Sequence, residues 1–340
     1  MSPAATRQEL PPLRLMPGAL PAAADEGAHN IGFEAVDRHV LRGHGEDVAL
    51  RWLPRQGAPR ELTYDDLRRE TNRFANVLRD GLGVGKGDRL FILCEGTPDF
   101  YVGLLGALKA GLMVCPLPPS LDAEAVRQRL EVGRPHVVLT TRALFEQEVE
   151  DSVPRIASLH HILVTGEPLR RLMREAPDEF DADFGSPSDA SFLHFTEDAH
   201  GAPTAVLHVS GETIMRHAMG RLALDLDRDD VFWCGVEPRT MPDIGYGILA
   251  PLLEGATCIV DEQPFSAERF YAVLESQDVS VWHASREALE TLVAAGDGPW
   301  AAHHFPRLRL VAVTGAPVDS HLAWWALDVL GVPIHQDAEP

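Results

Sequence analysis

The chain has 340 residues, 45% of them hydrophobic, so it can bury a large core and would ordinarily divide into two packed units. Its 51 acidic and 30 basic residues give a formal net charge of -21. This charge repels nucleic-acid phosphates and anionic lipid, so we expect a globular protein that binds neither nucleic acid nor membranes. The acidity itself is typical of a solvated surface.

The first 29 residues are predicted to form a disordered leader rich in proline and alanine. They lack the basic start and continuous apolar stretch of a signal peptide. No part of the sequence has the roughly 20 uncharged apolar residues that a membrane span needs. The cysteines form no C-x-x-C pair and lie in apolar runs, which indicates buried free thiols and a cytoplasmic location. They are Cys94, Cys115, Cys234 and Cys258.

Helical and strand patterns alternate after the leader, over residues 30–187. This βαβ alternation predicts an α/β subdomain with a largely parallel sheet covered by helices on both faces. Helices are predicted at 34–44, 63–81, 100–111 and 121–131, and strands at 89–95, 112–118, 136–141 and 160–166.

A polar stretch containing proline and aspartate, residues 174–190, precedes a second series of elements. We place the boundary near Ser186 to Asp189, which makes residues 188–340 a second, consecutive α/β subdomain. A helix is predicted at about 212–224, and strands at 191–196, 205–209, 230–235, 255–260, 279–284, 307–315 and 332–336.

Several sequence blocks resemble acetyl-CoA synthetases of the adenylate-forming superfamily, in the same order. They include N-I-G-F-E-A-V-D-R-H at 30–39, L-T-Y-D-D-L at 62–67, G-K-G-D-R-L at 85–90 and Y-G-I-L-A-P-L-L-E-G-A-T at 246–257. The resemblance runs from Asn30 to about His335. It implies the fold of the large N-terminal domain of these enzymes, truncated before the small C-terminal domain. The activity that it implies is AMP-forming acetate–CoA ligation with ATP and Mg²⁺.

The phosphate loop of that family reads approximately T-S-G-S-T-G-x-P-K-G. Small residues let backbone N–H groups approach the triphosphate, and the lysine adds positive charge. In this chain Glu197 and Asp198 replace the first serine and glycine, and Thr204 replaces the lysine. Each pair of like charges near 4 Å costs about 4 kcal/mol at an effective dielectric constant of 20. The matching positions are Thr196, Gly201 and Pro203.

An alternative is that Glu197 or Asp198 holds Mg²⁺, which in turn meets the nucleotide. The loss of glycine at position 198 disfavours it, because a turn of this kind uses the backbone freedom of glycine.

Other ligand blocks implied by the resemblance are also altered. Residues 235–243 stand where the family has T-A-D-x-G-W-x-T-G, with Glu237 as the nearest acid. The family's G-E-P turn is Gly315, Ala316 and Pro317, without its carboxylate. Residues 337–339 only faintly match the family's x-T-E segment. We expect the small domain with its catalytic lysine to be missing.

The predicted site is thus a vestigial nucleotide site without catalytic residues or a metal. Its residues are Thr196, Gly201, Pro203, Gly315 and Pro317. His194 and His208 flank the loop and would approach one another if their strands pair; we interpret them as structural histidines and not metal ligands. Hydrolase, zinc-protease and NAD(P) motifs are lacking.

A stripe of apolar residues, Leu322, Trp324, Trp325 and Leu327, is predicted on one helix face. Core packing explains it, and a surface for a partner is the alternative.

Three functions remain open at this stage. The first is an inactive relative that acts as a scaffold or regulatory partner, with a protein partner or self-association. The second is a divergent or split acetate or short-chain acyl–CoA ligase, which would use ATP and Mg²⁺. The third is a sensor that binds AMP or an acyl ligand. Fold resemblance does not choose between them, because function depends on the site.

Overall fold

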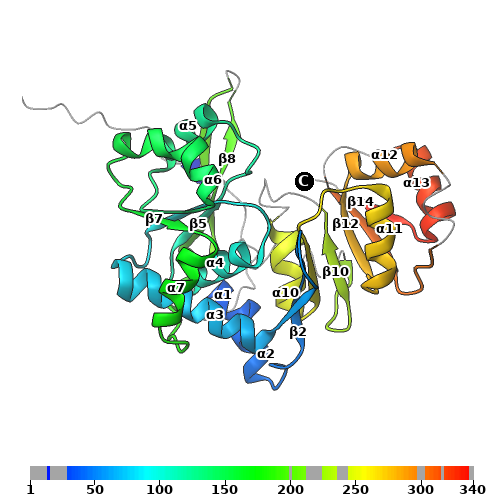
Figure 1. The fold of residues 1–340 in the computed structure, drawn as a ribbon, viewed down its shortest axis with the longest axis horizontal. Coiled ribbons are helices and arrows are strands. Elements are labelled where there is room, and N and C mark those ends of the chain that lie inside the picture. Colours follow the sequence, from blue (N-terminus) through cyan, green and yellow to red (C-terminus); the bar gives the residue numbers. More distant parts are fainter. Residues whose placement is uncertain are drawn as a thin grey trace, which may run out of the picture.

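The strands of the computed structural model form two sheets that stand side by side with helices packed on them (Figure 1). Among the described residues each sheet has seven strands. Both sheets are largely parallel, which confirms the predicted fold class. The structure describes residues 14–15, 29–198, 201–211, 224–235, 244–296, 303–314 and 318–336.

The first sheet has the order β1-β9-β8-β5-β4-β6-β7. All its neighbouring strands are parallel except β8 and β9, which form an antiparallel hairpin. Its strands are β1 (Arg14–Leu15), β4 (Arg89–Leu93), β5 (Met113–Pro116), β6 (Val137–Thr140), β7 (His161–Val164), β8 (Ala190–Glu197) and β9 (Pro203–Val209).

Four helices of the first half, α1, α3, α5 and α6, start at side-chain caps that the sequence supplies. The Thr63 hydroxyl accepts from the Asp66 backbone N–H and the Asp66 carboxylate accepts from the Thr63 N–H, while Asp122 caps α5. The helices are α1 (Ile31–Ala35), α2 (Asp37–Leu41), α3 (Tyr64–Asn76), α4 (Pro98–Lys109), α5 (Ala123–Gly133), α6 (Arg142–Leu144) and α7 (Glu167–Glu175), with π-helical turns η1 (Val77–Gly81) and η2 (Phe145–Val149) and the 3₁₀ segment η3 (Glu150–Arg155).

The second sheet has the order β14-β13-β12-β10-β11-β2-β3, and only its β2–β3 pair is antiparallel. Its strands are β2 (Val48–Leu53), β3 (Arg60–Thr63), β10 (Val231–Cys234), β11 (Thr257–Asp261), β12 (Val281–Ser285), β13 (Leu310–Thr314) and β14 (Ile334–Gln336). The helical segments of this half are η4 (Gly245–Leu249), α10 (Ala250–Glu254), α11 (Ala267–Ser276), α12 (Arg286–Ala295), α13 (Ser320–Trp325) and η6 (Ala326–Leu330).

The strands do not divide at residue 187 as the sequence suggested. β8 and β9 lie after that position yet join the first sheet, where Phe192 pairs with Val114. β2 and β3, which the sequence pattern did not reveal, join the second sheet through Leu50 and Cys258. Pairing between strands is a long-range choice, so the periodicity of each segment does not specify its sheet.

Two parts of the predicted leader pair with the folded chain. Arg14–Leu15 forms β1 beside β9, and His29 exchanges two backbone hydrogen bonds of 3.0 Å with Gly185. The predicted helix at about 212–224 lies outside the described residues except for its last position.

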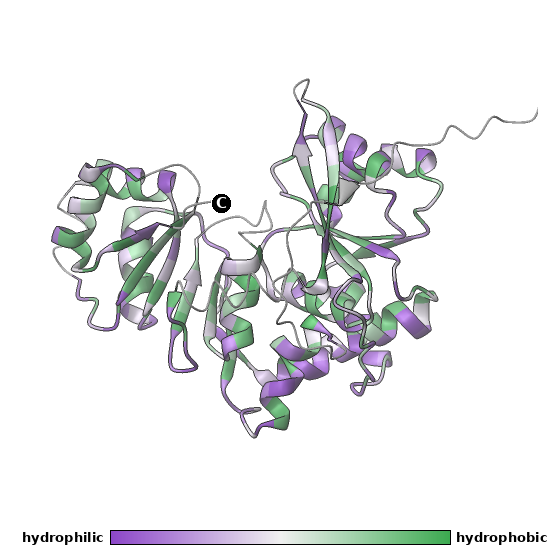
Figure 2. Cartoon of the chain, turned by 180° about the vertical axis from the view of Figure 1, so that it is seen from behind, coloured by the Kyte–Doolittle hydropathy of each residue, from purple (hydrophilic) through white to green (hydrophobic). Residues whose placement is uncertain are grey.

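One continuous apolar core joins the two sheets. It includes Leu90 of the first sheet, Phe74 of α3, Leu50 and Val260 of the second sheet, and Leu252 of α10. Figure 2 shows the apolar residues concentrated on the strands and on the helix faces turned toward them. The sheets therefore stabilise one another through shared burial.

A buried ion pair fixes α2 against α4. The Nζ atom of Lys109 lies 2.6 Å from Oδ2 of Asp37 and donates to Oδ1 of Asn72 at 2.8 Å. Burial lowers the pKa of Lys109 to about 8 and raises the pKa of Asp37. The mutual attraction thus compensates only part of the cost of removing both charges from water.

Candidate functional site

The β8–β9 hairpin brings three of the five predicted site residues together at its turn end. Thr196 pairs with Thr204 near the end of β8, Pro203 begins β9 opposite Glu197, and Gly201 lies in the turn between the strands. The other two predicted residues, Gly315 and Pro317, lie outside the described residues. Glu237 and residues 337–339 lie outside them as well.

Asp198 closes this turn. Its backbone N–H donates to the carbonyl of Ala202 at 2.9 Å, and its carboxylate accepts from the N–H of Ala202 at 2.9 Å. The N–H of Gly201 donates to the carbonyl of Asp198 at 3.0 Å. Gly201 has a φ of +79°, a left-handed conformation that favours glycine. The N–H groups of Gly201 and Ala202 therefore both donate to Asp198. In a phosphate cradle such groups donate to the ligand instead.

Glu197 pairs with a cation on a neighbouring helix. Its Oε1 atom lies 3.3 Å from Nη2 of Arg129 on α5, and the Glu197 side chain is 65% exposed. The Arg129 guanidinium also donates to the Ala125 carbonyl and lies over the Phe195 ring. Solvent screens such a pair, so it contributes at most about 1 kcal/mol to stability.

The carboxylates that the sequence predicted to face a triphosphate thus have protein partners, Arg129 for Glu197 and the Ala202 N–H for Asp198. They still leave the turn acidic. Among the described residues, the one cationic side chain that forms an ion pair with the turn is Arg129, and its partner is Glu197.

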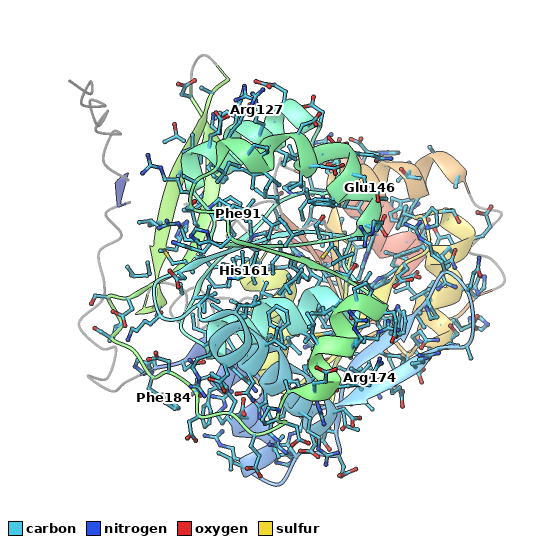
Figure 3. The ribbon with its side chains drawn as sticks, turned by 60° about the vertical axis from the view of Figure 1, so that its left-hand side comes forward. Phe91, Arg127, Glu146, His161, Arg174 and Phe184 are labelled. Atoms are coloured by element: carbon cyan, nitrogen blue, oxygen red, sulfur yellow. The ribbon has the colours of Figure 1, made fainter. Side chains whose placement is uncertain are left out.

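A pocket of about 320 Å³ lies between the turn and α5. Figure 3 shows α5, where Arg127 is labelled, beside the upper end of the hairpin. Among the described residues that line the pocket, Glu131 has the only charged side chain, and it pairs with Arg127 at 2.6 Å. The predicted site residues Gly201 and Pro203 both line it. The described residues that line the pocket therefore include no lysine or arginine that could bind a phosphate.

A cysteine and a histidine meet in the second sheet, and sequence reasoning missed this pair. Cys234 ends β10 and stands directly beside His283 of β12, with Sγ 3.5 Å from the ring Nδ1. Gly247 leaves room for them, because a Cβ atom there would approach the sulfur to 2.6 Å. Burial lowers the pKa of His283 to about 4, so at neutral pH its ring is uncharged and does not stabilise a thiolate as an imidazolium would.

The apolar residues around Cys234 and His283 in the sequence indicated that both are buried, but not that they lie side by side. The strand order β12-β10-β11 places them together across a gap of 49 residues. A pairing of β10 with β12 cannot be read from local periodicity.

The predicted approach of His194 and His208 is confirmed. Nε2 of His208 lies 2.7 Å from Nδ1 of His194, and the rings stack with centroids 4.7 Å apart. His208 is buried. In the part of the chain that the structure describes, histidine, cysteine, aspartate and glutamate side chains form no cluster of three or more that could hold a metal ion.

A family described as AMP-binding enzyme matches residues 37–336. The chain belongs to this family. The match confirms the resemblance to adenylate-forming enzymes drawn from the sequence blocks. The matched relatives are longer than this chain, as expected for a resemblance to the N-terminal portion of these enzymes.

Acetyl-coenzyme A synthetase of Bacillus subtilis (strain 168) is 32% identical over 318 residues, which is 91% of this chain and 55% of that protein. The crystal structure of an acyl-CoA synthetase from Brucella canis superposes with a TM-score of 0.81 at 28% identity, covering 93% of this chain and 58% of that one. An anthranilate CoA ligase, AuaEII, in complex with anthranoyl-AMP shares the fold, with a TM-score of 0.81 at 19% identity over 90% and 59% of the two chains. This AMP-binding family protein therefore spans little more than half the length of the relatives it matches.

The helices that the structure describes include none that is both long and apolar enough to cross a membrane.

Proposed function

We propose that this AMP-binding family protein does not form acyl-adenylates and acts as a scaffold or regulatory partner of another protein or of a second copy. The observation that carries the proposal is the hydrogen bond from the Ala202 N–H to the Asp198 carboxylate. The Asp198 carboxylate, a negative group of the protein itself, accepts from a backbone N–H of the turn. The family's sequence pattern predicts that such N–H groups donate to phosphate at this position.

The residues present do not fit ATP with Mg²⁺. Glu197 and Asp198 bring two carboxylates to the turn, and Thr204 supplies no charge at the position of the family's lysine. At about 4 Å, each unscreened approach of a carboxylate to a phosphate oxygen costs on the order of 4 kcal/mol at an effective dielectric constant of 20. Arg129 offsets part of this cost but is itself engaged by Glu197.

An exposed apolar surface supports the partner role. Of the predicted stripe, Leu322 is buried and Trp325 is half-buried, whereas Trp324 is 71% and Leu327 45% exposed. These two exposed side chains stand three residues apart on the continuous helical segment of α13 and η6, so they share a face. Exposed tryptophan is a favourable anchor for a protein interface.

The test is ATP–pyrophosphate exchange by the purified protein with Mg²⁺ and acetate, propionate or longer acids. This reaction isolates adenylation from thioester formation. The matched control is Gly201→Val, which disrupts the left-handed turn without changing charge. We expect no exchange above this control with any acid. Acid-dependent exchange above it would overturn the proposal and make the chain a divergent or split acyl–CoA ligase. Saturable AMP binding without exchange would replace the scaffold role with that of a sensor.

A further inference from the structure

A second pocket, of about 340 Å³, lies between α2 and the end of α10. Arg228 precedes β10, Glu254 precedes β11 and His44 precedes β2, so the pocket stands at the amino ends of these strands. Ligands of parallel α/β sheets ordinarily bind at the carboxyl ends. Figure 1 shows α2 at the lower end of the molecule and the β8–β9 hairpin at its upper end. The pocket is therefore separate from the candidate nucleotide site.

Basic side chains dominate the lining of this pocket, in a chain whose formal net charge is -21. One carboxylate, Glu254, accompanies them. The charged and titratable lining residues are Arg38, Arg42, Arg228, His39, His44 and Glu254.

Two of the three guanidinium groups have no carboxylate partner within ion-pair distance among the described residues. These are Arg42 and Arg228, both exposed; Arg228 forms a hydrogen bond with the ring of His44, at 2.9 Å. His44 in turn lies 3.3 Å from the Asp47 carboxylate. The Arg42 and Arg228 guanidiniums therefore retain donors for a ligand.

The third guanidinium, that of Arg38, is held in place by groups of the protein. Nη1 of Arg38 lies 3.2 Å from Glu34, and Nη2 donates to the Leu253 carbonyl. The Nε atom of Arg38 is buried and has no acceptor among the described residues. The guanidinium still lines the pocket and contributes its positive charge to it.

The C-terminal end of α10 repels an anion less than a helix C-terminus with unpaired carbonyl groups would. His39 donates from Nε2 to the Leu252 carbonyl at 2.8 Å, and Arg38 occupies the Leu253 carbonyl. Gly255 permits this contact, because its φ is +87° and a Cβ atom there would approach the His39 ring to 3.2 Å. The protein's own donors thus satisfy two of the partial negative charges that α10 directs toward the pocket.

We propose that this pocket binds a phosphate-class anion through Arg42 and Arg228, with the positive charge of Arg38 beside them. Planar guanidinium groups bind phosphate oxygens in pairs, and a volume of a few hundred Å³ admits pyrophosphate or the phosphates of a small nucleotide. The site adds a ligand-binding function that does not depend on the inactivity of the candidate nucleotide site.

Isothermal titration of the full chain with sodium pyrophosphate at low ionic strength tests the proposal. The test variant is Arg42→Ala, Arg228→Ala. The matched control is Arg170→Ala, Arg171→Ala, which removes the same charge from exposed positions of α7. We expect saturable binding by the native chain and the control, and an affinity about tenfold or more lower in the pocket variant. Circular dichroism checks that both variants fold.

Equal loss of affinity in the pocket variant and the control would overturn the proposal, as would the lack of saturable binding at millimolar pyrophosphate. ADP and adenosine distinguish the source of the phosphate. ADP that binds more tightly than pyrophosphate, and only with Arg42 and Arg228 intact, identifies a nucleotide as the ligand. Pyrophosphate that binds as tightly as ADP, with no binding of adenosine, identifies the free anion.

Discussion

The carboxylate of Asp198 accepts a hydrogen bond from the backbone N–H of Ala202 at 2.9 Å, across the turn where the sequence resemblance predicts a phosphate loop. The same two residues are joined by a second bond in the opposite direction, from the Asp198 N–H to the Ala202 carbonyl. An internal anion thus stabilises a closed turn. Changes at this turn should affect nucleotide affinity more than overall stability.

Restoring the family's residues should improve nucleotide binding. The triple variant Glu197→Ser, Asp198→Gly, Thr204→Lys removes two negative charges, adds a positive one and releases the Ala202 N–H. We expect tighter binding of ATP with Mg²⁺, measured by isothermal titration. The control Glu146→Ser, Glu175→Ser, Thr291→Lys makes the same change in charge at exposed positions away from the turn. An equal gain in the control would mean that net charge, and not the turn, limits affinity.

A double-mutant cycle tests the ion pair between Lys109 and Asp37. Lys109→Met leaves the Asp37 carboxylate buried without its cation, so we expect a loss of about 3–5 kcal/mol in the free energy of unfolding. The double variant Asp37→Leu, Lys109→Met removes both charges and should recover much of that loss. Urea denaturation measures each corner of the cycle. A double variant as unstable as the sum of the single variants would show that the two charges do not interact.

Two buried histidines should make the protein sensitive to acid. Burial lowers the pKa values of His39 and His283 to about 4, below the 6.5 of an unperturbed histidine. Between these values the unfolded chain binds protons that the folded chain excludes. The stabilising contribution is therefore complete above pH 6.5 and is lost as the pH falls toward 4.

His283→Leu isolates one of these contributions. Among the described residues Nε2 of His283 has no hydrogen-bond partner, so an apolar side chain should be tolerated at neutral pH. Between about pH 7.5 and pH 5 the native chain should lose about 2 kcal/mol more than the variant. Urea midpoints at both pH values give the comparison, with the exposed His321→Leu as control. Equal losses in native chain and His283→Leu would contradict the assignment.

Trp324 and Leu327, the exposed apolar residues of α13 and η6, should affect self-association without affecting the free energy of unfolding. Trp324→Ser, Leu327→Ser alters exposed side chains, so unfolding should change by no more than about 0.5 kcal/mol, while self-association weakens in sedimentation velocity. Leu322→Ala, at a buried position, should instead cost about 2–5 kcal/mol. Unchanged sedimentation of the double variant would exclude this face as the contact between copies.

Much of the local structure could be predicted because it depends on short-range patterns. The apolar run at 89–95 contains β4, the pattern at 63–81 contains α3 and η1, and the capping pair Thr63 and Asp66 lies at a helix start. The resemblance predicted a loop at Gly201, and in the structure this residue lies in a turn with a φ of +79°. Charge changes at positions 197, 198 and 204 are likewise properties of the sequence.

The sequence by itself determined the α/β class, the family and the acidic character of the predicted phosphate loop, because periodicity and residue type are local. Only the tertiary structure decided that β2 and β3 join the second sheet and β8 and β9 the first. It also decided that Asp198 folds back onto Ala202, that Cys234 stands beside His283, and that arginines from residues 38–42 and 228 share one pocket. These contacts arise from the shared burial of distant segments in one core, and a local pattern carries no information about which distant segments meet.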